Sequence, residues 1–184
     1  MILVRITPTQ LKELSLLRDY VTPDQWSWVS ANVMAVELTD DQKAEILSLF
    51  RAIIQEGINA LTVLTTYRAD DFSLYLLNIL HQTSPRKVYN LADGFLVGLT
   101  LRDEELLVKA QRFYASLPGH LMDVVVCYCR HHGSLKACGS QLYLHRNTVN
   151  QKINEFIHLT GMDLRHSSYQ LFLRILVTVL YGVP

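Results

Sequence analysis

The sequence predicts two domains, an α+β or α/β domain over residues 1–118 and an all-α domain over residues 119–184. Before Pro118, segments rich in β-branched residues alternate with segments of helical periodicity, as in a sheet covered by helices. After Gly119, every segment has helical periodicity alone. Pro118 and Gly119 end one helical pattern and precede another, so we place the boundary there.

The composition is that of a folded protein without a membrane-spanning segment. Of the 184 residues, 49% are hydrophobic and 18% are charged, which argues against extensive disorder. The first residues lack the basic segment of a secretory signal, and Arg5 interrupts their apolar run. The most apolar stretch, residues 171–181, contains Arg174 and is too short to span a bilayer. We therefore expect a cytoplasmic protein with no membrane partner.

Helix-start signals recur along the N-terminal part. The tetrapeptides TPTQ (residues 7–10), TPDQ (22–25) and TDDQ (39–42) each combine a capping Thr with a Gln that closes a capping box. Pro at the second position of the first two fits the first turn of a helix. Asp70 is expected to cap a further helix, and residues 102–116 are predicted to form the last one.

The predicted strands lie between these helices. Residues 32–38 and 60–66 have the composition of short strands. Residues 87–91 and 95–99 are predicted to form a hairpin whose turn is Asp93-Gly94. After two short leading helices, the N-terminal domain is thus expected to run β-α-β-α-β-β-α.

Helical periodicity in the C-terminal part predicts four helices. Gly133 ends the first of them, and Ser134 can cap the second. A tight turn over residues 143–145 leads to the third helix, which Gly161 ends, and residues 169–181 form the fourth. Two short helices joined by a tight turn have the layout of a helix-turn-helix. The alternative is a plain αα-hairpin inside a helical bundle, whose polar face meets only water.

The polar face of the third helix favours nucleic-acid binding. The apolar stripe of this helix consists of Val149, Ile153, Phe156 and Ile157. At about 100° per residue, Asn147 and Gln151 lie nearly opposite that stripe. Asn and Gln pair with adenine in the major groove, whereas Lys and Thr suit phosphate oxygens.

The charge distribution points the same way, although the net charge of the chain is zero. Residues 1–119 carry 11 basic and 14 acidic side chains, a net charge of −3, whereas residues 120–184 carry 6 and 3, a net charge of +3. Six of the seven histidines also follow Gly119. The asymmetry indicates that the C-terminal part faces an anion, with chance fluctuation as the alternative for so small a difference.

Three blocks in the C-terminal part carry a family resemblance. Residues 132–135 (HGSL), 142–149 (LYLHRNTV) and 159–164 (LTGMDL) strongly resemble the C-terminal helix-turn-helix domain of the PucR/CdaR family. The resemblance covers about a third of the chain, and the HRNT and LTGxDL blocks at this spacing make it specific. It implies a Fis-like DNA-binding fold in a bacterial transcription regulator whose partner is double-stranded DNA.

The same resemblance places Arg146, Asn147 and Thr148 at the start of the recognition helix. Family members usually carry Arg-Tyr-Arg where this chain has residues 150–152 (NQK), so this chain has one cation at these positions instead of two. Residues 165–168 (RHSS) likewise replace an acidic-Pro segment. The DNA-binding residues predicted from the helix face and the resemblance together are Ser134, His145, Arg146, Asn147, Thr148, Asn150, Gln151 and Lys152.

The N-terminal domain is expected to be a regulatory or dimerisation domain. Longer family members often carry a degenerate GGDEF-like, cyclase-like domain before the helix-turn-helix, and the α/β pattern here is compatible with a reduced version of it. This chain has no Gly-Gly-Asp/Glu-Glu-Phe run, so no cyclase chemistry is expected. A phosphate-binding glycine loop, a nucleophile elbow and a paired-His metal motif are all missing from the sequence, so we expect no enzyme. The pairs Asp40-Asp41 and Asp70-Asp71 suit helix caps better than a metal site.

Three cysteines, Cys127, Cys129 and Cys138, lie near His131, His132 and His145. One interpretation of this cluster is a zinc site, and the other is a set of buried structural cysteines. However, the chain has no CxxC knuckle, and helical residues two apart point away from each other. Buried, reduced cysteines and no metal or other cofactor are therefore expected.

Two further partners are expected. Residues 171–180 are apolar almost all round the predicted final helix, which predicts burial against either a second copy or the N-terminal domain. We expect a homodimer, with an unidentified small-molecule effector as the second candidate partner. The alternative function is a protein-interaction module that keeps the helix-turn-helix fold without sequence-specific DNA binding.

Overall fold

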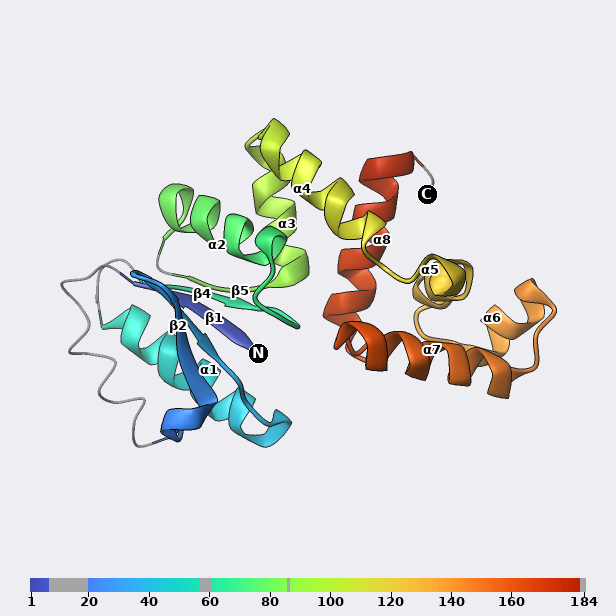
Figure 1. Cartoon of the computed structure of the whole chain (residues 1–184), viewed down its shortest axis with the longest axis horizontal. Helices are drawn as coiled ribbons and strands as arrows, with labels where there is room; N and C mark the ends of the chain where they lie inside the picture. Colours follow the sequence, from blue (N-terminus) through green and yellow to red (C-terminus); the bar gives the residue numbers. More distant parts are fainter. Residues whose placement is uncertain (7–19, 57–60, 86, 183–184) are drawn as a thin grey trace. The chain divides into compact units, whose positions relative to one another are not determined.

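The computed structural model describes residues 1–6, 20–56, 61–85 and 87–182 (Figure 1). The chain divides into two compact units, residues 1–101 and residues 102–184, which are described separately below. The predicted helix start at residues 7–10 lies outside the described residues. None of the described helices is long and apolar enough to cross a membrane.

The first unit contains a five-stranded mixed sheet in the order β2-β3-β1-β4-β5. The central strand β1 pairs antiparallel with both β3 and β4, and β4 pairs parallel with β5. Leu3 stands opposite Ala35 on one side and Leu64 on the other. The strands are β1 (Ile2–Arg5), β2 (Trp26–Ser30), β3 (Val33–Val36), β4 (Thr62–Thr65) and β5 (Lys87–Asn90). A mixed sheet with these helices confirms the predicted α+β class.

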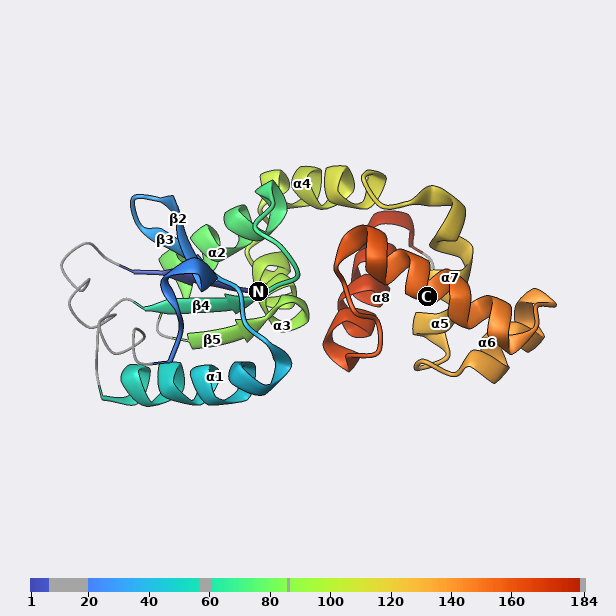
Figure 2. The same cartoon turned by 60° about the horizontal axis from the view of Figure 1, so that its bottom comes forward.

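Helices cover both faces of this sheet, with α1 (Asp40–Gln55) on one side and α2 (Asp71–Thr83) and α3 (Leu91–Thr100) on the other (Figures 1 and 2). The core beneath α1 contains Val4, Met34 and Phe50, all buried. The predicted starts of α1 and α2 are confirmed. Thr39 accepts a hydrogen bond from the Gln42 backbone, and Asp70 accepts one from the Ser73 backbone at 2.8 Å.

The predicted hairpin around Asp93-Gly94 is wrong, because residues 91–100 form the helix α3. The side chain of Asn90 accepts a hydrogen bond from the Asp93 backbone at 2.9 Å and so caps the helix directly after β5. Gly94 serves packing rather than a turn, since a Cβ atom there would lie 3.0 Å from a methyl group of Leu80. Close approach of α2 and α3 outweighs the local preference of Asp-Gly for turns.

The helix predicted to start at residues 22–25 is also wrong. The TPDQ capping box forms, but only as the single 3₁₀ turn Pro23–Gln25. The chain then continues as β2, whose Trp26 stands opposite Val36 of β3. Strands β1 and β2 were not predicted from the sequence. Strand β1 pairs with β3 and β4, which are far away in the chain, whereas β2 pairs with β3 directly after it. Local capping signals carry no information about either pairing.

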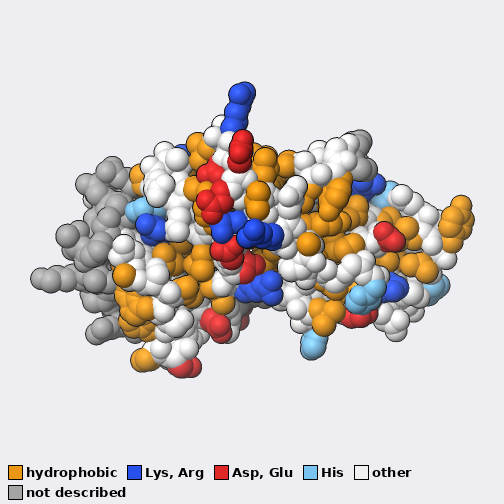
Figure 3. Space-filling view, turned by 45° about the horizontal axis from the view of Figure 1, so that its top comes forward, with side chains coloured by type: hydrophobic (Ala, Val, Ile, Leu, Met, Phe, Trp, Pro, Cys, Tyr) orange, Lys and Arg blue, Asp and Glu red, His pale blue; other side chains and the backbone are white. Residues whose placement is uncertain are grey.

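The second unit is entirely helical and contains α4 (Glu104–Ala115), a 3₁₀ turn (Gly119–Leu121), α5 (Met122–Arg130), α6 (Leu135–Leu142), α7 (Arg146–Thr160) and α8 (Ser167–Tyr181). The boundary between the two compact units lies between Leu101 and Arg102, whereas the sequence places it at Pro118 and Gly119. The difference arises because α4 packs on α8, with the Phe113 and Phe172 ring centroids 5.7 Å apart. On α4 itself, Lys109 and Glu105 form an ion pair at 3.5 Å. Acidic and basic side chains interleave on the face of the molecule drawn in Figure 3.

The final helix α8 leaves less apolar surface exposed than its sequence suggests. Its apolar side chains divide into two groups. The buried group, which packs within the helical unit, is Phe172, Leu173, Leu176 and Val177. Leu171 and Val179 on the other side are 42% and 40% exposed, so only part of the helix surface remains to be covered.

Candidate nucleic-acid interface

The chain between α5 and α6 turns through two left-handed residues. His132 has φ 51° and Gly133 has φ 81°. The Ser134 hydroxyl then accepts a hydrogen bond from the Ala137 backbone at 3.2 Å, which caps α6 as predicted. Ser134 therefore has a structural role and stays exposed, so its hydroxyl proton is available to a second acceptor.

A tight turn of three residues joins α6 to α7. The Leu144 backbone donates a hydrogen bond to the Gly139 carbonyl at 2.9 Å. At Gly139, a Cβ atom would lie 2.6 Å from the carbonyl oxygen of Leu144, closer than real Cβ atoms approach. Only glycine lets the turn fold back this closely on α6. Tyr143 at the end of α6 has φ 55° and ψ 35°, the left-handed conformation.

His145 is the N-cap of α7, and its Nδ1 accepts a hydrogen bond from the Asn147 backbone at 3.2 Å. This cap requires an unprotonated Nδ1, because a protonated ring nitrogen cannot accept. The first turn of α7 contains no acidic residue. The free backbone N–H groups and the positive end of the helix dipole are therefore left for an anion.

The predicted buried stripe of α7 is confirmed for Val149, Ile153 and Phe156, which are buried, whereas its fourth member, Ile157, is half-buried. The opposite side carries the predicted site residues, and the structure brings them together on one helix and its cap. The exposed ones are His145, Arg146, Asn147, Asn150 and Gln151, and the half-buried ones are Thr148 and Lys152. Ser134 lies apart from them, at the start of α6.

Asn154 also belongs to this surface and was not predicted from the sequence. Asn154 is exposed and follows Asn147 and Gln151 at helical spacing, so the three side chains form one stripe, here called the amide stripe. The same 3.6-residue period that identified the other two would have identified it.

The charges around the amide stripe favour an anionic partner. Residues 124–162 include a single carboxylate, Glu155, which lies 3.1 Å from His120. The cations of α6 and α7 are Lys136, Arg146 and Lys152. In the part of the chain that the structure describes, none of these three forms an ion pair with a carboxylate.

The three cysteines are free and buried, as predicted, and pack α5 against α6. The sulfur of Cys127 lies 3.8 Å from the Cys138 carbonyl oxygen. Burial raises the pKa of the Cys129 thiol to about 12, and burial and neighbouring thiols raise that of Cys138 to about 12 as well. Both thiols are therefore protonated and unreactive at neutral pH.

His131 bonds to Gln141 rather than to a sulfur. Across the described ranges, no group of three or more His, Cys, Asp or Glu side chains is placed to hold a metal ion.

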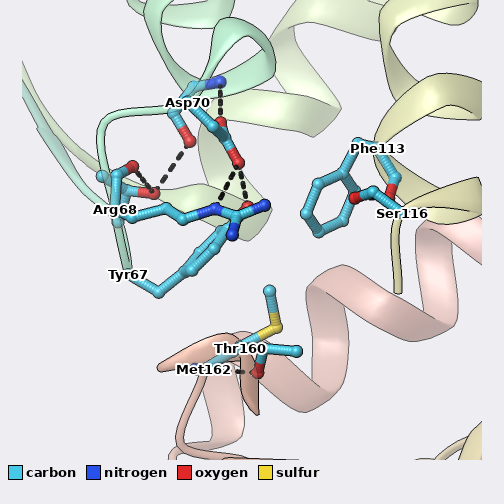
Figure 4. A network of polar contacts seen from close by, with 9 residues as sticks. Tyr67, Arg68, Asp70, Phe113, Ser116, Thr160 and Met162 are labelled. Carbon is cyan, nitrogen blue, oxygen red and sulfur yellow. Dashed lines mark hydrogen bonds and ion pairs between the residues drawn. The ribbon is translucent and has the colours of Figure 1, made fainter. Parts of the chain in front are cut away.

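Asp70, one of the acidic residues weighed as metal ligands from the sequence, acts as a helix cap. Its carboxylate accepts hydrogen bonds from the Ser73 backbone and from the Tyr67 hydroxyl. Figure 4 shows the Arg68 guanidinium beside the same carboxylate, with Nε 3.3 Å away. Burial and the neighbouring Asp70 raise the pKa of Tyr67, so its hydroxyl remains a donor. This arrangement satisfies the carboxylate without a metal.

Comparison with known families identifies the helical unit. The model of the PucR C-terminal helix-turn-helix domain matches residues 121–177, just under a third of the chain. The chain therefore carries a PucR-type helix-turn-helix, and α6 and α7 are its two central helices. A comparison with curated proteins gave no match.

Proposed function

We propose that this protein is a bacterial DNA-binding transcription regulator that reads the major groove with α7, beginning at Arg146. The observation that carries the proposal is the surface of this helix. It combines the amide stripe with cations that pair with no carboxylate of the described residues, and with a helix N-terminus free of acidic residues. Ordinary solvated helix faces carry many Lys/Arg–carboxylate pairs, whereas among the described residues the cations of α6 and α7 form none, and Glu155 lies against His120.

The residue types suggest how the contacts are divided. The amide stripe is suited to bidentate pairing with adenine, and Arg146 to pairing with guanine. Lys152, Thr148 and Ser134 suit phosphate oxygens, which position the helix without reading sequence. His145 and Asn150 flank the stripe and complete the contact surface.

Loss of Arg146 and loss of Lys152 are expected to act differently. Arg146→Ala should weaken binding to a selected genomic site by about 1–3 kcal/mol and relax the base preference at one position. Lys152→Ala should weaken all sequences alike and lower the salt dependence by about one counterion. Salt-titrated binding to selected and mixed-sequence duplexes measures both effects.

The matched control is Arg112→Ala, which removes an exposed arginine from α4 and should leave binding unchanged. If both α7 variants bind as wild type does, the assignment of α7 to the major groove is wrong. If the wild-type protein fails to bind any genomic fragment at low salt, the protein-interaction module is the better description.

The working unit in this proposal is a homodimer on double-stranded DNA. One copy offers Lys136, Arg146 and Lys152 on α6 and α7, which neutralise few phosphates, so its electrostatic affinity at physiological salt is small. Two copies place two recognition helices in successive major grooves about 34 Å apart. Sedimentation at micromolar concentration should show a dimer, whereas a monomer that still binds a non-palindromic site would exclude it.

The N-terminal sheet unit is assigned a dimerisation or effector-sensing role, and neither unit is assigned a catalytic one. No cofactor is part of the proposal. The cysteines are buried and Asp70 caps a helix, so these side chains already have structural roles.

A further inference from the structure

Among the large hydrophobic side chains of the described residues, Tyr143 is the most exposed, at 97%, and it lies in the turn between α6 and α7. A tyrosine in such a place gains no burial. Among the described contacts its side chain has no hydrogen bond, ion pair or ring partner. The folded protein alone gives no reason for an aromatic residue here.

The backbone of Tyr143 is also disfavoured. Its φ of 55° and ψ of 35° are left-handed, a conformation in which a Cβ atom crowds the following carbonyl. The same chain ends α7 and α8 in this conformation with Gly161 and Gly182, the residue that fits it without strain. Tyr143 is the exception among these three helix ends.

The surroundings of Tyr143 are polar and free of acid. It precedes the α7 cap His145 by two residues, beside the end of the helix dipole that favours anions. Lys136 and Ser140 are both exposed on α6, the helix that Tyr143 ends, and their spacing of four residues puts them on one side of it. A cation, a hydroxyl and a phenol with no neighbouring carboxylate match the oxygens of a phosphate chain.

Resting on the function proposed above, we infer that Tyr143 is a DNA-backbone contact. Its phenol donates a hydrogen bond to a phosphate beside the groove that α7 enters, and Lys136 and Ser140 contact the same strand. Strain and exposure in the free protein thus serve an interaction made only with DNA. An apolar protein surface is the poorer occupant, because the exposed neighbours Ser140, Gln141 and His145 are all polar.

This role predicts opposite effects on stability and on binding. Tyr143→Gly relieves the left-handed strain, so the melting temperature of the full chain should rise by about 3 °C. The same variant should bind a mixed-sequence duplex of about three helical turns roughly tenfold more weakly at low salt. Tyr143→Phe keeps the ring and the strain, so its melting temperature should stay at the wild-type value while most of the binding loss remains.

Arg102→Gly is the matched control, since Arg102 is a second non-glycine residue with φ near 52° and lies outside α6 and α7. It should raise the melting temperature and leave DNA binding unchanged. Wild-type affinity in Tyr143→Gly, or a fall in both stability and affinity, would overturn the role of Tyr143 alone. Absence of DNA binding by the wild-type protein in the same titration would overturn the proposed function and this inference with it.

Discussion

Replacing Gly139 with alanine is expected to destabilise the helical unit by about 3 kcal/mol and to abolish DNA binding. A helical glycine-to-alanine change normally stabilises a protein by up to about 1 kcal/mol, because alanine loses less entropy on folding. Here the new Cβ atom would stand 2.6 Å from the Leu144 carbonyl oxygen. This neighbour is backbone in the turn that orients α7, so it cannot move without moving the helix.

Gly119→Ala provides the control for this change. A Cβ atom at Gly119 meets nothing within 4 Å, so the same substitution should change stability by less than about 0.5 kcal/mol. Thermal unfolding followed by helical ellipticity, together with duplex binding, measures both variants. A Gly139→Ala protein that melts and binds as wild type does would show that α6 and α7 do not meet at this angle.

The sequence predicts those elements whose signals are local. The caps of α1 and α2 depend on Thr39 and Asp70 and on residues within three positions of them, and both predictions are confirmed. Strand β1 depends on β3 and β4, which are about 30 and 60 residues distant along the chain, and it was not predicted. The Asp93-Gly94 hairpin failed for the same reason, since packing against Leu80 decides the conformation of Gly94.

In the candidate interface, too, only the features with local signals could be predicted from the sequence. Helical periodicity alone places Asn147 and Gln151 opposite the core of α7 and would also have found Asn154. The left-handed backbone of Tyr143 and the approach of Gly139 to Leu144 depend on how one helix turns into the next. No sequence pattern gives that angle, because alanine at position 139 would fit the periodicity of α6 equally well.

Truncating Phe156 to alanine is expected to cost about 3–5 kcal/mol, the largest effect of a single side chain on α7. Phe156 is fully buried on the inner face of the recognition helix, together with Val149 and Ile153. Its loss leaves a cavity under the middle of the helix, and the amide stripe on the outer face then loses its fixed orientation. DNA binding should therefore weaken although Phe156 itself touches no DNA.

Leu159→Ala on the same helix separates the burial of Phe156 from the mere loss of an apolar side chain. Leu159 is 55% exposed, so its truncation removes little buried area and should cost less than about 1 kcal/mol. Chemical unfolding gives the free energies, and amide exchange in α7 shows whether the helix opens locally. Equal losses of unfolding free energy in the two variants would mean that Phe156 does not anchor α7. The burial of Phe156 would then no longer identify the opposite side of α7 as the exposed binding face.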